Sequence, residues 1–287
     1  MDKRYIFIIP FVLIIITIIY LFYKSKGAQK TFKAEVQKSL KRTSTFEKRV
    51  LTENDIKRLP QIVQKYLKYV GVIGKEKIYN LRTVTEINMN LGSDKGWTIM
   101  TAEEYNFFDD SPGRLVLMKF KMRGLPVVGL DSYIGGKGRM LMKPLGLFAV
   151  VDAKGHEMDD SSAVAMLLLN MCTAAPATLI DNRLQWSSIS PTSVKATFNN
   201  SGCIVSGVLD FKENGELINF STEDKYYSPS GDSYEQVRWS TPVKDYKDIN
   251  GLKLATYGEA IWHFPKGDNC YGKLILKKIE YNCESVR

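Results

Sequence analysis

The chain has 287 residues, of which 44% are hydrophobic, and its 40 lysines and arginines exceed its 31 aspartates and glutamates by a formal charge of +9. Eleven of these basic residues and three of the acidic ones lie in residues 1–50, which leaves 29 basic and 28 acidic residues after position 50. A nucleic-acid-binding domain carries its excess charge on its folded part, so this near-neutral remainder argues against nucleic acid as a partner.

An apolar run of eighteen residues, interrupted only by Pro10 and Thr17, extends over residues 6–23. At about 1.5 Å per residue, a helix of this length spans roughly 27 Å, enough to cross the hydrocarbon core of a bilayer. A cleaved signal peptide is the alternative. However, the run exceeds a typical h-region, and Lys24 and Lys26 interrupt the small residues at which a peptidase would cut. We therefore predict a single-pass anchor in the cell membrane.

The predicted anchor occupies residues 1–24, and the segment that follows it, residues 25–50, is rich in lysine. Such a segment typically meets anionic head groups, so we expect a basic juxtamembrane linker with membrane lipids as its partners. Within it, Phe32, Val36 and Leu40 recur at helical spacing, which predicts a solvated or membrane-skimming helix. The lysines behind the anchor favour a cytoplasmic domain, whereas a short basic tail ahead of the anchor is common in anchors that export their domain. The side of the membrane therefore stays open.

Residues 51–287 are predicted to form one β-rich globular domain. It begins with an amphipathic helix, because Val63, Tyr66, Leu67 and Val70 recur at i, i+3, i+4 and i+7. Gly71 follows in the place of a left-handed cap. We expect the apolar face of this helix to dock on a sheet.

Strand patterns dominate the rest of this domain. The clearest is a meander over residues 194–222, in which apolar and polar residues alternate and polar turns separate three strands. Further strand patterns extend over residues 81–90, 98–106, 114–122, 131–142, 233–239, 253–264 and 272–281. So many strands with few helices predict a mainly β (α+β) fold. It is either a β-sandwich or an antiparallel curved sheet that forms an open half-barrel.

One short apolar segment, residues 164–171, interrupts the succession of strands and stops near Ala175-Pro176. It is too short to cross a bilayer as a helix. We expect a buried helix or a lid over the sheet.

The residues that most often bind metals are too scattered to predict a site. The chain has four cysteines and two histidines, Cys172, Cys203, Cys270, Cys283, His156 and His263. No two cysteines show the C-x-x-C spacing of common zinc sites, so we expect neither a metal nor another cofactor. We expect His263 to be hydrogen-bonded within the protein or to lie on the surface. The four cysteines are compatible with one or two disulfides or with free thiols.

Side chains of the strands and of the short helix are candidates to line a concave apolar pocket, although core packing is the competing interpretation for each tryptophan. These candidates are Trp97, Phe120, Leu168, Trp186, Phe198, Trp239 and Trp262. The polar candidates for the same site are Asp131, Asp224 and Lys225. Adjacent carboxylates such as Glu103-Glu104 support acid–base chemistry only where the fold groups them with others.

An ordered set of motifs resembles an uncharacterised bacterial family of single domains, many of them behind an N-terminal transmembrane segment. The motifs include Leu59-Pro60-Gln61, Gly129-Leu130-Asp131, Ala175-Pro176-Ala177, Gln185-Trp186, Thr241-Pro242 and Ala260-Ile261-Trp262. The chain departs from this family at Asn170, where the resemblance implies an acid, and at Lys225, where it implies an arginine. More distantly, the strands behind an N-terminal helix are similar to the LolA-type half-barrel, which implies an extracytoplasmic carrier that holds acyl chains in a concave sheet.

These features together predict a membrane-anchored module that binds an apolar or lipid ligand in a curved sheet. A membrane-associated hydrolase that uses clustered carboxylates, or an envelope scaffold without a ligand, are the alternatives. The absence of a spaced nucleophile or metal motif favours the binding module.

Overall fold

The structure is a computed structural model that describes residues 13, 16, 17, 20, 21, 23–90, 92, 96–155, 161–200, 202–228 and 233–287. Most of the predicted anchor, residues 1–24, including most of its apolar run, therefore lies outside the described residues. In the part of the chain that the structure describes, no helix is both long and apolar enough to span a membrane.

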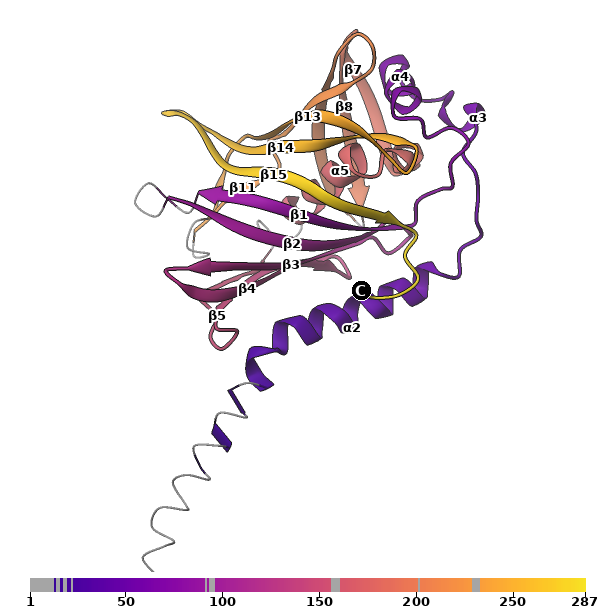
Figure 1. Ribbon diagram of the computed structural model, residues 1–287. Coiled ribbons are helices and arrows are strands. Elements are labelled where there is room, and N and C mark those ends of the chain that lie inside the picture. Colours follow the sequence, from indigo (N-terminus) through magenta and orange to yellow (C-terminus); the bar gives the residue numbers. More distant parts are fainter. Residues whose placement is uncertain are drawn as a thin grey trace, which may run out of the picture.

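A single antiparallel sheet of 13 strands forms the body of the molecule, with the strand order β6-β5-β4-β3-β2-β1-β15-β14-β13-β10-β9-β8-β7 (Figure 1). Its strands are β1 (Asn80–Asn90), β2 (Trp97–Phe107), β3 (Gly113–Met122), β4 (Leu125–Ile134), β5 (Lys137–Pro144), β6 (Val151–Ala153), β7 (Leu184–Ser190), β8 (Ser193–Asn200), β9 (Cys203–Phe211), β10 (Leu217–Thr222), β13 (Trp239–Ile249), β14 (Leu252–Phe264) and β15 (Gly267–Tyr281). The strands β11 (Tyr226–Tyr227) and β12 (Glu235–Gln236) form a separate pair. The first and last long strands, β1 and β15, are neighbours, so the sheet joins the two ends of the domain. The prediction of a mainly β fold built on a large antiparallel curved sheet is confirmed.

The described helices are α2 (Gly27–Thr43), α3 (Glu53–Ile56), α4 (Gln61–Val70), α5 (Ala163–Thr173) and the 3-10 helix η2 (Pro176–Ile180). The predicted amphipathic helix is α4, and it does dock with Val63, Tyr66 and Leu67 buried. It ends at Gly71, whose φ of 85° is the left-handed conformation that glycine adopts without strain. The sheet curves around α5, which lies on its inner side together with α4 (Figure 1).

Helix α5 is part of the main hydrophobic core, which we call the inner cluster: the buried apolar residues of α4, α5, β8–β10, β13 and β14. Leu167 and Leu168 are completely buried within it. Two tyrosine hydroxyls hold the end of the helix, because Tyr66 donates to the carbonyl of Cys172 and Tyr281 to the carbonyl of Ala174, each at 2.6 Å. Of the two expectations for residues 164–171, the structure therefore has the buried helix and not the lid.

Helix α2 differs from the predicted linker and from a solvated or membrane-skimming helix. Its apolar stripe, Phe32, Val36 and Leu40, is buried against the outer face of the sheet. Here β2 and β3 present Tyr105, Phe107, Leu115 and Leu117, and with α2 these residues form what we call the outer cluster. The physical reason is that β3 is apolar on both faces, so its outer face also needs a partner.

Candidate functional site

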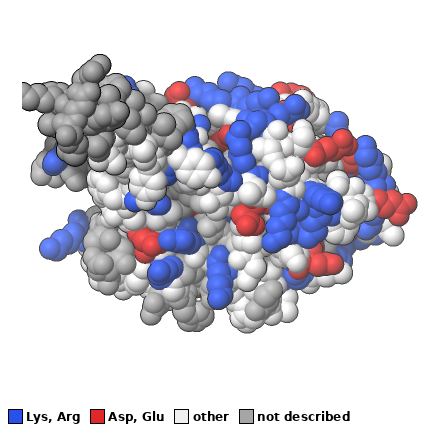
Figure 2. All heavy atoms as spheres, turned by 90° about the horizontal axis from the view of Figure 1, so that it is seen from below, with Lys and Arg blue, Asp and Glu red and all other residues white. Residues whose placement is uncertain are grey.

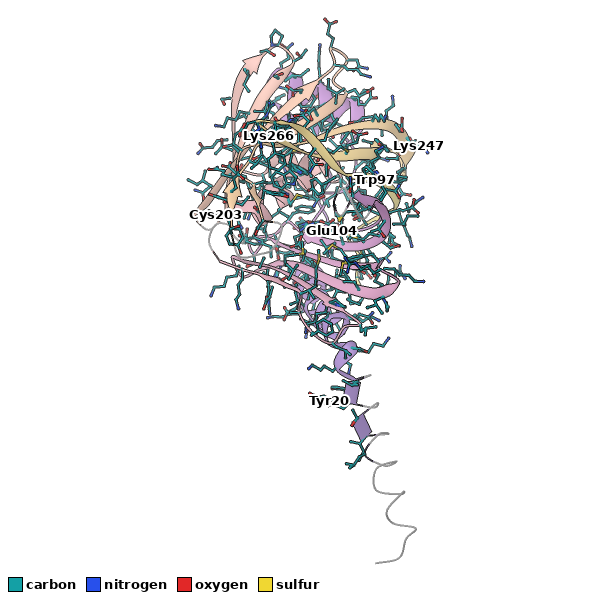
Figure 3. The ribbon with its side chains drawn as sticks, turned by 90° about the vertical axis from the view of Figure 1, so that its left-hand side faces the viewer. Tyr20, Trp97, Glu104, Cys203, Lys247 and Lys266 are labelled. Carbon is teal, nitrogen blue, oxygen red and sulfur yellow. The ribbon has the colours of Figure 1, made fainter. Side chains whose placement is uncertain are left out.

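A group of charged side chains lies on the inner face of the sheet, beside α5. Alternation along β2, β3 and β4 turns Glu104, Arg114 and Asp131 to the same face as α5. Glu104 occupies the middle of the molecule in Figure 3. A small cavity of about 80 Å³ opens here, and its lining includes Asp131, Met140, Ser162, Met166 and Lys225. A buried charged side chain requires ionic or hydrogen-bonding partners within the protein or from a ligand. The partners of each charged side chain therefore indicate what the site can bind.

Arg114 is the centre of this group. Its guanidinium is buried, with Nε donating to Glu104 at 2.7 Å and the second nitrogen donating to Asp131 at 2.5 Å. The amide of Asn170 on α5 also donates to Glu104, at 2.7 Å, and the amide of Asn106 does so at 3.0 Å. Both carboxylates of the group are thereby used as counter-ions of Arg114 and as hydrogen-bond acceptors.

Lys225 is held in place by the backbone around it. Val237 donates its N–H to the carbonyl of Lys225 at 3.1 Å, and the neighbouring Asp224 accepts the backbone N–H of Ser206 at 2.6 Å. Only 9% of Lys225 is exposed. The chain between β10 and β11 therefore carries its lysine to the inside of the sheet.

The ammonium of Lys225 has soft and aromatic partners. Its Nζ lies 4.4 Å from the ring centre of Trp239, 5.7 Å from that of Trp262 and 3.1 Å from the sulfur of Met166. Among the described residues, no carboxylate forms a salt bridge with this nitrogen. Burial lowers the pKa of Lys225 to about 7, and repulsion from Arg114 adds to this effect, while Asp131 opposes it. An anion placed in the cavity would supply the missing counter-charge.

A second apolar surface, which we call the methionine wall, lies on the inner face of β1–β5. It comprises Met100, Ala102, Val116, Met118, Phe120 and Val127, which are buried, and Ile87, Met89, Met122, Met140 and Met142, which are partly buried. Six of the ten methionines of the chain are in this one cluster. Met140 also lines the cavity beside Lys225, so the charged group and the methionine wall are adjacent.

The structure brings some of the predicted pocket residues together. Trp239 and Trp262 are cross-strand partners beneath Lys225, and Trp239 donates its indole N–H to the hydroxyl of Tyr271 at 3.1 Å. Asp131 and Lys225 line the same cavity. Phe120 belongs to the methionine wall.

Other predicted residues lie elsewhere. Leu168 and Phe198 are completely buried in the inner cluster, and Trp186 packs at its edge, so these three are core residues. Asp224 caps backbone groups and does not line the cavity beside Lys225. Trp97 is 49% exposed and faces outward, because it is three residues from the inward-facing Met100 on a regular strand. The prediction that Trp97 lines the cavity is therefore wrong.

Histidine and metal chemistry gain no support from the described residues. His263 pairs through Nδ1 with Asp268 at 2.7 Å and through Nε2 with the hydroxyl of Ser240 at 2.8 Å. Within the described part of the chain, no group of three His, Cys, Asp or Glu side chains is placed to hold a metal ion. His156 lies outside the described residues.

Sequence reasoning missed Arg114, Asn106 and Met166. A signal for Arg114 was present, since it shares strand parity with Val116, Met118 and Phe120, the apolar side of its strand. A charged residue at a core-facing position is rare unless it is paired, so this position alone indicated a buried ionic group.

Residues 49–274 match the model of a protein family described as "Family of unknown function (DUF6544)". The chain therefore belongs to this family, as its motifs predicted. No curated protein matches the sequence.

Among solved structures, the fold is similar to three bacterial proteins, each 10% identical to the chain. The first is a putative outer membrane lipoprotein-sorting protein domain from Vibrio parahaemolyticus, with a TM-score of 0.39, and the match covers 70% of this chain and 85% of that one. The second is a LolA superfamily protein from Nitrosomonas europaea, with a TM-score of 0.38, and the third is a DUF1329 family protein from Desulfovibrio piger, with a TM-score of 0.40. Each of these two matches covers 77% of this chain and 91% of the other one. At these scores the likeness transfers no function, and the site itself must supply the argument.

Proposed function

We propose that the protein is a membrane-anchored binding module for an amphiphile with an acidic group, of the fatty-acid or anionic-lipid class. The single observation that carries this proposal is Lys225, a buried cation that lines a cavity and has aromatic rings and a thioether as its partners. A buried charge is costly without an opposite charge. An acidic ligand group at this position would offset that cost.

The methionine wall supports the apolar half of the ligand. Methionine side chains are unbranched and polarisable, so they adapt to irregular shapes and are common at surfaces that bind varied apolar partners. A single wall with six of them suits a flexible acyl chain better than a rigid molecule. Because Met140 borders both the wall and the cavity, a ligand with its acidic group at Lys225 would have its chain directly against the wall.

The cavity of about 80 Å³ has room for a head group or a few water molecules and is too small for a long acyl chain. Binding a whole amphiphile therefore requires side chains of the methionine wall to change rotamer. Met89, Met122, Met140 and Met142 are only partly buried, which leaves them space for such changes.

A hydrolase that uses clustered carboxylates fits the site less well. On the inner face beside α5, the fold brings the carboxylates of Glu104 and Asp131 together, and both accept hydrogen bonds from Arg114. Both are held as counter-ions of Arg114, whereas a general acid or base must be within hydrogen-bond reach of the substrate group that exchanges the proton.

Lipid analysis of the full-length chain tests the proposal. The chain is purified in mild detergent and examined by native mass spectrometry, and its extract is analysed for acidic lipids. We expect an acidic amphiphile to remain bound to the wild type and to be lost from Lys225→Met, which keeps the volume and removes the charge. Lys195→Met, which alters an exposed lysine on β8, is the matched control and should retain it. Equal retention by both variants, or no acidic amphiphile in the wild type, would refute the proposal.

A further inference from the structure

The connection between β5 and β6 exposes apolar side chains to solvent. Residues 144–150, with the sequence Pro-Leu-Gly-Leu-Phe-Ala-Val, contain no polar side chain, and we call them the apolar loop. Leu145, Phe148 and Val150 are exposed, Phe148 to 57%. Leu125, at the start of β4, is also exposed and adjoins them, because Leu145 donates its N–H to the carbonyl of Pro126 at 2.7 Å. Contiguous exposed apolar residues mark interaction surfaces.

The backbone of the apolar loop holds these side chains outward. Leu147 closes a tight turn by donating to the carbonyl of Pro144 at 3.1 Å, and Val150 donates to Met142 at 2.9 Å. The two central residues of the turn, Leu145 and Gly146, have φ values of 53° and 70°. A leucine side chain rarely adopts positive φ, so this conformation is strained, and strain of this kind concentrates at functional positions.

The apolar loop lies beside the point where the chain leaves the domain toward the predicted anchor. Gly146 packs so closely on Ser25 that a Cβ at this position would overlap the backbone of Ser25. Ser25 is only two residues beyond Tyr23, the last residue of the apolar run. A groove of about 310 Å³ runs between the start of α2 and β4–β5, and its lining includes Gly27, Leu130 and Lys143. An anchor in a bilayer would thus bring the apolar loop to the bilayer surface.

The charges around the apolar loop are mainly positive. Lys24, Lys26 and Lys30 are exposed on the adjoining helical segment, and Lys143 precedes the loop. Figure 2, which views the molecule from the side of α2, shows lysines and arginines over much of this face and fewer acidic residues. Basic residues around an apolar patch suit a surface of anionic lipid head groups.

We infer that the apolar loop and Leu125 form a second membrane contact, which enters the interface of an anionic bilayer and seats the domain against it. The inference rests on the proposed anchor, which brings Ser25 to the membrane. A lipid surface is favoured over a protein partner because the loop packs against Ser25, next to the proposed anchor, and exposed lysines surround it. The apolar side chains would be buried about 5–10 Å deep, at the boundary between head groups and acyl chains.

Tryptophan quenching in vesicles tests this contact directly. The full-length variant Phe148→Trp is reconstituted in vesicles of phosphatidylcholine and phosphatidylglycerol with brominated acyl chains, which quench only tryptophans that reach them. Ile189→Trp is the matched control, since Ile189 is also 57% exposed but lies on β7, at the opposite edge of the sheet. The emission of the wild type, with its four tryptophans, is subtracted from both.

We expect the added emission of Phe148→Trp to be lost in brominated vesicles, and that of Ile189→Trp to persist. Persistence of both signals in vesicles that carry the protein would overturn the loop contact and leave the anchor standing. A chain that does not float with the vesicles at all would overturn the anchor and, with it, the loop contact. If acrylamide in the water fails to quench the introduced tryptophan of Phe148→Trp and bromine in the lipid also fails, the loop is covered by protein, in this sample a second copy of the chain. That result would also overturn the inference.

Discussion

At the scale of single residues, the inner face contains two cations in opposite situations. Arg114 forms ion pairs with two carboxylates, whereas Lys225 contacts aromatic rings and a sulfur. Both side chains lose their hydration when they are buried. Among the described residues, only Arg114 has carboxylate partners that compensate for this loss. The two cations should therefore respond in opposite ways to substitution.

Replacing Lys225 by methionine is expected to stabilise the ligand-free protein in a pH-dependent way. The pKa of Lys225 is lowered from 10.5 to about 7, so between these values the unfolded chain binds a proton that the folded protein has released. The free energy of unfolding of the wild type therefore rises as the pH rises from about 7 to 10.5. Below pH 7 the wild type is less stable than Lys225→Met by a few kcal/mol. Urea unfolding of delipidated protein at pH 6.5 and pH 10 measures this. A stability difference between Lys225→Met and the wild type that does not shrink with rising pH would contradict it.

Replacing Arg114 by methionine is expected to destabilise the fold by about 3–5 kcal/mol, because Glu104 and Asp131 would be left facing a buried site without their cation. Arg139→Met is the control. Its ion pair with Asp152 is half exposed, and such pairs contribute about 0–1 kcal/mol. Equal losses of stability in urea for the two variants would show that Arg114 is not the centre of the buried group.

At the scale of elements, α2 decides where the folded domain begins. Phe32 is buried against Tyr105, with ring centres 5.9 Å apart in an edge-on arrangement. The Arg42 side chain adds an ion pair to the buried Asp109 at the end of the helix. The helix is therefore a structural layer on the outer face, and its lysines face solvent.

The substitution Phe32→Ala is expected to cost about 3–5 kcal/mol of stability, as for other fully buried phenylalanines. It should also make the lysine-rich helix α2 accessible to trypsin under native conditions, because local stability depends on this packing. Gln37→Ala, on the exposed face of the same helix, should change neither stability nor cleavage. Wild-type protease resistance of Phe32→Ala would mean that α2 is dispensable to the domain.

At the scale of the whole molecule, the start of α2, the basic face and the apolar loop lie on one side. The inner face with Lys225 lies across the sheet from α2. This arrangement would leave the binding site accessible while the opposite face rests on lipid. The two apolar surfaces of β2–β4 thus differ, because α2 covers the outer one and the methionine wall forms the inner one.

The full-length protein is expected to stay in the membrane fraction after washing with high salt. Burial of an apolar run of eighteen residues does not depend on ionic strength, whereas attachment through lysines alone is screened and released. Fractionation before and after the wash, with N-terminal sequencing, checks this. A soluble form that begins near Ala28 would identify residues 1–27 as a cleaved signal peptide.

The sequence by itself determined most of the long strands, the amphipathic helix α4, the mainly β class and the membership of the family. These follow from local periodicity, because alternation and helical spacing are properties of short segments. The sequence treated residues 131–142, which belong to β4 and β5, as one strand, and its prediction for residues 233–239 ends where β13 begins. It also placed Asp131 and Lys225 among the polar candidates, although it could not pair Asp131 with Arg114 or Lys225 with Met166.

Only the tertiary structure decided which face of each strand is the inner one. Trp97 and Met100 show why: alternation along one strand places them on opposite faces, but the curvature of the whole sheet decides which of these faces is the inner one. The same holds for α2. Its apolar stripe is equally compatible with a membrane surface and with a protein core, and only the apolar outer face of β3 decides for the core. Contacts among Glu104, Arg114 and Asn170 join β2, β3 and α5, and Lys225 reaches α5 from the β10–β11 connection through Met166. No pattern along a single segment specifies such long-range neighbours.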